Sequence, residues 1–289
     1  MRLLPHAFRP ALLASCALSL AALAACAGPQ GMGGAAGRQA AGSPPAGISE
    51  ATVLDIARRT RRDGDLSTAL AFYRRAHALA PDDVRPLDGI GETLDRMGAP
   101  NEAAEAYRAA LQRRPDDPAA RRGLAVALVA LDQPAAAIAA FHDALAGAPD
   151  ARLYDGLGIA EDLAGDFVAA EAAYRQGLAL APGDAGLRNN LGLSLALAGN
   201  FPAALAMLQP LSGEPGATAR NRLNLALVLG LAGRMAEAAA VARHDLDEES
   251  VRRNLAYYAE LARLPAAARA QAILMPGRAP GMAPRATAE

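Results

Sequence analysis

A pattern of five residues returns along the chain at a spacing close to 34 positions. Its most regular copy has a turn glycine, a small residue, an aromatic residue, a second small residue and a closing proline. These are Gly98, Ala103, Tyr107, Ala110 and Pro115. Each has a counterpart 34 positions earlier, and related copies follow it and end at Pro149 and Pro182. A period of this length, with an apolar helical face on each side of a turn, indicates tandem pairs of α-helices.

The residue types in this pattern suit close helix packing. Small side chains such as Ala69, Ala103 and Ala137 let the two helices of a pair cross at short distance. The aromatic residue is expected to fill the space beside the next pair, and proline ends the second helix. Aspartates such as Asp117 and Asp184 then suit the start of the following helix. The pattern resembles the tetratricopeptide repeat, which implies an all-α solenoid of helix–turn–helix units.

About six units are expected over residues 50–264. The first five begin near Glu50, Val84, Pro118, Ala151 and Ala185, and the sixth contains Leu225, Gly233 and Ala238. In the fifth unit, the prolines and glycines of residues 209–217 are expected to cut the second helix short. A last helix, over residues 248–264, is expected to cap the exposed end of the array. Residues 265–289 are predicted to form a frayed helix and a disordered tail.

The first 25 residues are interpreted as a lipoprotein signal peptide. A basic start precedes an apolar run that is too short to span a membrane. The sequence Leu23-Ala24-Ala25-Cys26 resembles a bacterial lipobox, in which the cysteine is acylated and becomes the first residue. An ordinary secretory signal is the alternative. Residues 26–49 would then form an acylated flexible tether. Ala27 is not an aspartate, so the resemblance implies the periplasmic face of the outer membrane.

The sequence contains few residues in arrangements typical of catalysis, cofactor binding or metal binding. The chain contains no lysine, which excludes Schiff-base and P-loop lysines. After maturation its histidines are His77, His142 and His244, each without a neighbour at ligand spacing. The glycine pairs at residues 89 and 91 and at 156 and 158 lack a third glycine and a preceding strand, so close helix packing explains them better. We therefore predict no enzyme activity, no cofactor and no metal site. The net charge of −1 gives no support for nucleic-acid binding.

In tetratricopeptide repeats, the first helix of each unit lines a groove that binds other proteins, and the resemblance implies the same here. The predicted groove is basic in unit one, acidic in unit two and apolar in units three to six, where it begins with Val126 and Val129. Its residues are Arg58, Arg61, Arg62, Asp88, Glu92, Asp95, Ile159, Asn189, Leu193, Leu197, Leu227 and Leu231. The apolar half is expected to dock a partner helix or an extended peptide. Alternatively, the C-terminal helix of the chain fills the end of this groove, or these positions are core between repeats.

The last third of the chain resembles one particular group of tetratricopeptide-repeat proteins. Asn224-Leu225-Ala226-Leu227 and Asn254-Leu255-Ala256-Tyr257-Tyr258 resemble the C-terminal repeats of TadD-type lipoproteins of the tight-adherence (Flp) pilus system. This implies an outer-membrane-anchored scaffold for assembly of the Flp pilus and secretion apparatus, with proteins such as the secretin as partners. The alternative is a tetratricopeptide lipoprotein of another envelope machine, for β-barrel insertion, type IV pilus secretin assembly or polysaccharide export.

Overall fold

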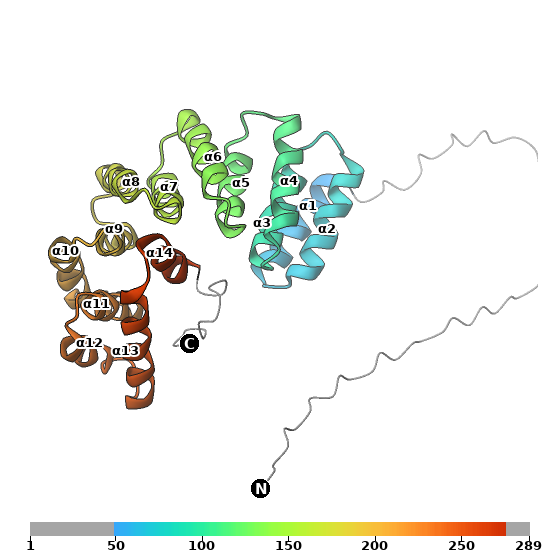
Figure 1. The fold of residues 1–289 in the computed structure, drawn as a ribbon. Coiled ribbons are helices and arrows are strands. Elements are labelled where there is room, and N and C mark those ends of the chain that lie inside the picture. The colour runs from blue at the N-terminus through green and yellow to red at the C-terminus, as the bar shows by residue number, and fades with distance from the viewer. Residues whose placement is uncertain (1–48, 276–289) are drawn as a thin grey trace, which may run out of the picture. The chain divides into compact units, whose positions relative to one another are not determined.

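The computed structural model describes residues 49–275 of the 289-residue chain (Figure 1). Fourteen α-helices and no strand occur in the described residues. The helices are α1 (Glu50–Arg62), α2 (Leu66–Leu79), α3 (Arg85–Arg96), α4 (Pro100–Arg113), α5 (Pro118–Ala130), α6 (Pro134–Gly147), α7 (Ala151–Ala164), α8 (Phe167–Leu180), α9 (Ala185–Leu197), α10 (Phe201–Gly213), α11 (Ala219–Leu231), α12 (Met235–Ala242), α13 (Glu248–Arg263) and α14 (Ala266–Leu274). The predicted signal peptide, the predicted acylation site Cys26 and all but the end of the predicted tether lie outside the described residues.

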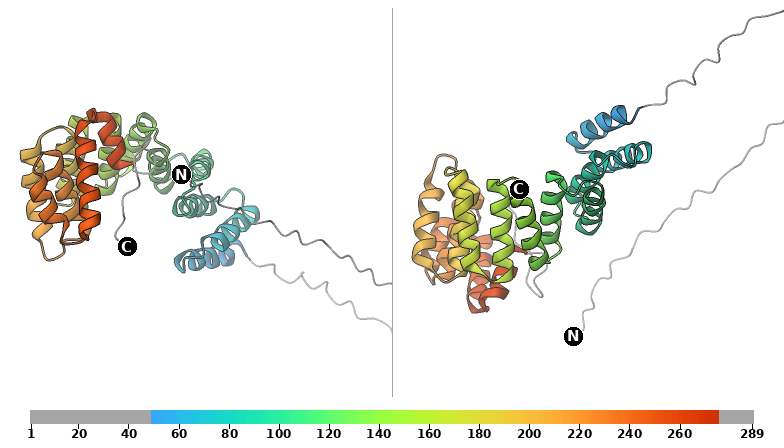
Figure 2. Two further views of the ribbon diagram at one scale, coloured as in Figure 1. Left: turned by 60° about the horizontal axis from the view of Figure 1, so that its bottom comes forward. Right: turned by 90° about the horizontal axis from the view of Figure 1, so that it is seen from above.

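Helices α1 to α12 form six consecutive pairs, and each helix packs against the next one along the chain. Neighbouring odd-numbered helices of these pairs also contact each other, whereas neighbouring even-numbered helices do not. The stack therefore bends with its odd-numbered helices on the inner side (Figures 1 and 2). We call α1, α3, α5, α7, α9 and α11 the inner layer. The predicted all-α solenoid of helix–turn–helix units is confirmed.

The turn inside each pair requires the left-handed region of backbone conformation, which favours glycine. In five of the six pairs this residue is a glycine with φ between 72° and 90°. In the third pair Asp132 takes its place with φ of 59°, a conformation that aspartate tolerates better than most residues do. At the helix starts, Asp117 and Asp184 accept hydrogen bonds from backbone amides, as predicted.

Aromatic side chains of the second helices pack onto glycines of the first helices. A Cβ atom added to Gly91 or Gly123 would lie 2.5 or 2.2 Å from the ring of Tyr107, so only glycine fits on either side of this ring. Phe141 and Tyr174 likewise press on the glycine pair at residues 156 and 158. The prediction that these glycines permit close helix packing is confirmed.

Two expectations for the C-terminal part can be compared with the structure. In unit five, residues 209–217 were expected to cut the second helix short; α10 continues through Pro210 and ends at Gly213, within this stretch. The helix tolerates the proline three residues before its end, and Leu208 and Leu211 on either side of it are buried. Residues 266–274 form a helix, α14, that is packed into the core rather than frayed. The predicted capping helix is present as α13. None of the described helices is both long and apolar enough to cross a membrane.

Candidate functional site

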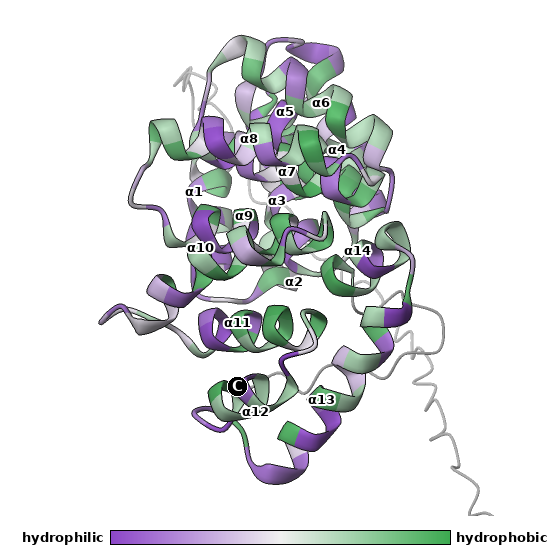
Figure 3. Cartoon of the chain, turned by 60° about the vertical axis from the view of Figure 1, so that its left-hand side comes forward, coloured by the Kyte–Doolittle hydropathy of each residue, from purple (hydrophilic) through white to green (hydrophobic). Residues whose placement is uncertain are grey.

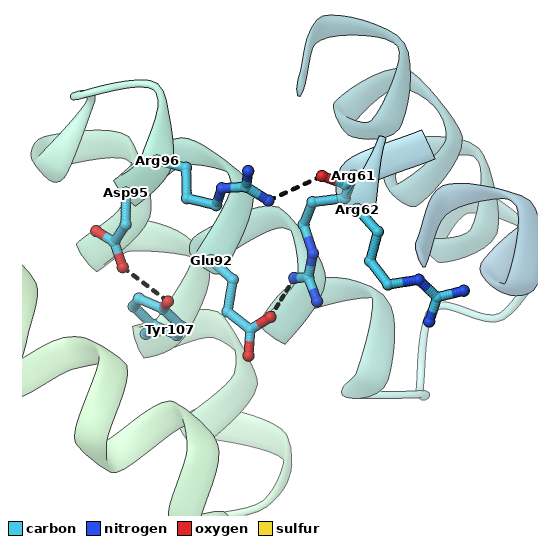
Figure 4. A pocket seen from close by; sticks show the side chains of 6 residues that line it. All are labelled: Arg61, Arg62, Glu92, Asp95, Arg96 and Tyr107. Carbon is cyan, nitrogen blue, oxygen red and sulfur yellow. Dashed lines mark hydrogen bonds and ion pairs between the residues drawn. The ribbon is translucent and has the colours of Figure 1, made fainter. Parts of the chain in front are cut away.

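The N-terminal part of the inner layer carries a charged hollow of about 400 Å³ (Figure 4). Its wall consists of Arg61, Arg62, Glu92, Asp95, Arg96 and Tyr107, from α1, α3 and α4. Four of these six residues belong to the predicted groove. The structure thus brings two predicted basic residues of unit one, Arg61 and Arg62, together with two predicted acidic residues of unit two, Glu92 and Asp95; Arg58 and Asp88 are not part of the wall.

Most side chains of this hollow hold one another in position. Arg61 forms an ion pair with Glu92 across α1 and α3, and its guanidinium lies 5.5 Å from the centre of the Tyr73 ring. Arg96 donates a hydrogen bond of 2.8 Å to the carbonyl oxygen of Arg61 (Figure 4). Arg62 is exposed and has no hydrogen bond or ion pair within residues 49–275. This arginine is therefore the free cation of the hollow, available to a partner.

The hollow is bordered by carboxyl groups in unusual environments. Burial, followed by the charges of Asp117 and Glu92, raises the pKa of Asp88 to about 7. One oxygen of Asp88 is buried without a hydrogen-bond partner in the described residues. Burial also raises the pKa of Asp95, although the hydroxyl group of Tyr107 opposes this by donating a hydrogen bond of 2.8 Å. These acidic side chains and Arg62 give the open part of the inner layer a mixed charge pattern. Arg58 lies half-exposed beside it, paired with Asp55.

The apolar positions of the predicted groove become progressively more buried along the array. One position of the repeat is occupied in turn by Val126, Ile159, Leu193 and Leu227. The exposed fraction is 47% at Val126 and falls to 7% at Leu193 and 1% at Leu227, with Ile159 between these extremes. Val126 alone of the four presents a large apolar surface to solvent.

The remaining predicted groove residues of units five and six are also buried. They are Asn189, Leu197 and Leu231. The four leucines of these two units belong to one core cluster with residues of α13 and α14. In the chain as described, they are therefore packed against the C-terminal helices and not open to a partner. This placement matches the two alternatives left open by the sequence, self-occupation by the C-terminus and core between repeats.

A buried polar network in units four to six was not predicted. Asp162 accepts hydrogen bonds from the hydroxyl groups of Tyr174, at 3.0 Å, and Ser194, at 2.7 Å. Asn224 donates to Asn189 at 3.0 Å, which joins α11 to α9. A signal was present in the sequence, because Asp162 and Tyr174 have the same separation of 12 residues as Asp95 and Tyr107. No group of three or more potential metal ligands occurs within the part of the chain that the structure describes.

Two overlapping stretches match models of known families. Residues 96–158 and 156–209 each match a model described as a tetratricopeptide repeat. A comparison with curated proteins finds no match.

Several solved structures share the arrangement of helices. A crystal structure of MamA is 26% identical in sequence, with a TM-score of 0.52. The matched region covers 56% of this chain and 90% of the MamA chain. The crystal structure of PilW, described as a widely conserved type IV pilus biogenesis factor, is 24% identical in sequence and has a TM-score of 0.61. The matched region covers 69% of this chain and 96% of the PilW chain. A tetratricopeptide repeat protein from Parabacteroides merdae is 18% identical in sequence and also has a TM-score of 0.61. Here the matched region covers 75% of this chain and 86% of the other chain. At the identities of PilW and the last protein, the likeness concerns the fold alone.

Proposed function

We propose that this chain, a tetratricopeptide-repeat protein, is a scaffold that binds other proteins during assembly of the Flp pilus and secretion apparatus. The observation that carries the binding function is the open part of the inner layer. There, exposed Arg62 of unit one and half-exposed Val126 of unit three face solvent in the same array. A surface with a free cation and an uncovered apolar side chain suits a protein partner, since apolar contact supplies affinity and charge selects orientation.

The assignment to the Flp system rests on the sequence of the last third of the chain. Asn224-Leu225-Ala226-Leu227 lies in α11, and Asn254-Leu255-Ala256-Tyr257-Tyr258 lies in α13. Residues of both stretches belong to, or pack against, the core cluster of the C-terminal part of the array. The likeness to PilW adds that a protein of pilus biogenesis has this fold, and it concerns the fold only.

The proposed location is the periplasmic face of the outer membrane, with acylated Cys26 as the anchor. A lipid-modified residue carrying more than one acyl chain would hold the array stably at the membrane. The partners are other envelope proteins, with the secretin or another pilus assembly component first among them. The proposal includes no enzymatic step, no cofactor and no nucleic acid.

Deletion of the gene, followed by counting of surface pili and measurement of adherence, tests this function. Loss of pili that is restored by the wild-type chain is the expected result, and unchanged piliation would contradict the proposal. Complementation with Arg62→Glu should restore fewer pili, because this exposed arginine lies in the hollow. Arg75→Glu on α2, exposed and outside the wall of the hollow, is the matched control and should restore piliation fully.

The second candidate is a scaffold of another envelope machine, for β-barrel insertion, type IV pilus secretin assembly or polysaccharide export. The open inner layer serves any of these equally well, so the neighbouring genes discriminate between them. A secretin, a pilus ATPase and a small Flp-type pilin beside this gene favour the Flp system.

A further inference from the structure

The last described helix, α14, lies on the inner layer of the chain's own array. After α13 the chain changes direction at Pro265, and α14 then packs against α7 and α9 (Figures 1 and 3). Ala270, Ala272 and Ile273 are its buried residues, and all three belong to the core cluster that contains the leucines of α9 and α11. A nine-residue segment thus occupies the surface where the repeat pattern predicts a partner.

The contacts of α14 define which helix fits this surface. Its contacting face consists of two alanines followed by a branched aliphatic residue, which lets the helix backbone approach closely. At the N-terminal end, the methyl group of Ala267 lies 3.9 Å from the position where Gly165 would carry a Cβ atom. Between the two buried alanines, the side-chain amide of Gln271 donates a hydrogen bond of 2.7 Å to Asp132, in the turn that follows α5. The surface therefore recognises a small-residue helix that carries an amide donor.

The attachment of α14 is suited to exchange. A helix of nine residues is too short to be stable in water without the surface that it covers. Hydrogen bonds connect it to α13 and to the residue after α13: the hydroxyl group of Tyr257 donates to the Ala272 carbonyl at 3.2 Å, and Arg269 donates to the carbonyl oxygens of Leu261 and Leu264. Once displaced, α14 would lose its helical structure and leave the surface of α7 and α9 free.

We propose that the surface of α7 and α9 under α14 is a second binding surface, which accepts a short helix of a partner protein in exchange for α14. The entering helix has small residues on its contacting face, an amide donor for Asp132 and a terminal branched aliphatic residue. This inference deepens the proposed function, since it divides the inner layer into an open charged part and a part that opens on exchange.

Release of α14 in the full-length chain tests the proposal. The probe is a fluorescent synthetic peptide of residues 264–275, whose binding is measured by anisotropy. Wild-type chain should bind it weakly, because the attached α14 competes at a high effective concentration. Ile273→Asp places a charge in the buried contact and should bind the peptide at least tenfold more tightly. Ala268→Asp changes an exposed residue of the same helix and should behave as wild type.

Two results would overturn the proposal. The first is an Ile273→Asp chain that keeps its helical circular dichroism and binds the peptide no better than Ala268→Asp. The second is a wild-type dimer in light scattering that the same change dissociates, since α14 would then be exchanged between two copies. If Ile273→Asp unfolds the array, Gln271→Ala replaces it, with about threefold tighter binding expected and unchanged binding contradicting the proposal. Because no pilus protein is present, this result is independent of the piliation test.

Discussion

Units two and four contain the same aspartate–tyrosine pair and differ in what covers it. In unit two, the hydroxyl group of Tyr107 donates to Asp95 at 2.8 Å, and both residues line the charged hollow. In unit four, Tyr174 donates to Asp162 at 3.0 Å, but the aspartate is only 1% exposed and Ser194 of α9 supplies a second donor. The helix that carries Asp162 also has α14 packed against it.

The difference shows that neighbouring elements, rather than the pair itself, set the environment of the carboxyl group. Burial raises the pKa of both aspartates, and for Asp162 it reaches about 7. In unit three the same two positions hold Val129 and Phe141, so the polar pair is replaced by an apolar one that packs in the local core. The contact between the two helices of a unit therefore tolerates either pair, provided that the two partners match.

Removal of the carboxyl group should give the largest difference in stability between the two aspartate–tyrosine pairs. Asp162→Ala leaves two buried hydroxyl groups without their acceptor and should lower the free energy of unfolding by about 3 kcal/mol. Asp95→Ala leaves one hydroxyl group beside an open hollow that water can enter, and should lower it by about 1 kcal/mol. Chemical denaturation followed by circular dichroism measures both values. Equal losses would show that the covering of unit four has no energetic consequence.

The pH dependence of stability should also differ between the two aspartate–tyrosine pairs, by a smaller amount. Because the folded pKa of Asp162 is about 7, above the ordinary aspartate value of 3.8, the folded chain keeps a proton that the unfolded chain releases between these values. The contribution of this group to stability is full below pH 3.8 and is lost as the pH rises to about 7. Asp162→Asn, which can still pair with both hydroxyl groups, should reduce the loss of stability between pH 5 and pH 8 by about 2 kcal/mol. Asp95→Asn, at the more open site, should reduce it less, and identical pH profiles for both variants would contradict the assignment.

The periodic features of the fold were predictable from the sequence, because each rests on local chemistry. The turn glycines, the aromatic residue between glycines and the aspartates at helix starts recur at fixed spacing. Even Asp132, which replaces a turn glycine, was identified by its position in the period. Pro210 does not itself end α10, since a proline in the last turn can be accommodated when the flanking leucines are buried, and the helix ends three residues later at Gly213.

The state of the groove was not predictable in the same way. Leu193 and Leu227 were expected to line the apolar part of the groove, and the pattern alone could not distinguish an open surface from one that is already covered. The covering depends on contacts between distant parts of the chain, such as the hydrogen bond between Gln271 and Asp132 across 139 positions. A repeat pattern contains no information about such a contact. The charged part of the groove was easier to predict from the sequence, because Arg61 and Glu92 lie in adjacent units of the repeat.

The smallest expected difference concerns the ion pairs of the two parts. Arg61 pairs with Glu92 at the open hollow, and Arg188 pairs with Glu214 in unit five. The two glutamates are equally exposed, at 42% and 40%, so solvent screening is comparable. The second pair has two parallel hydrogen bonds, of 2.6 and 3.0 Å, and such bidentate geometry strengthens an arginine–carboxylate pair. Glu214→Gln should therefore lower the free energy of unfolding by more than Glu92→Gln does, although both losses are small because solvent screens the exposed glutamates. Denaturation at low and high salt measures this; a larger loss for Glu92→Gln would mean that the open hollow contributes to stability as well as to binding.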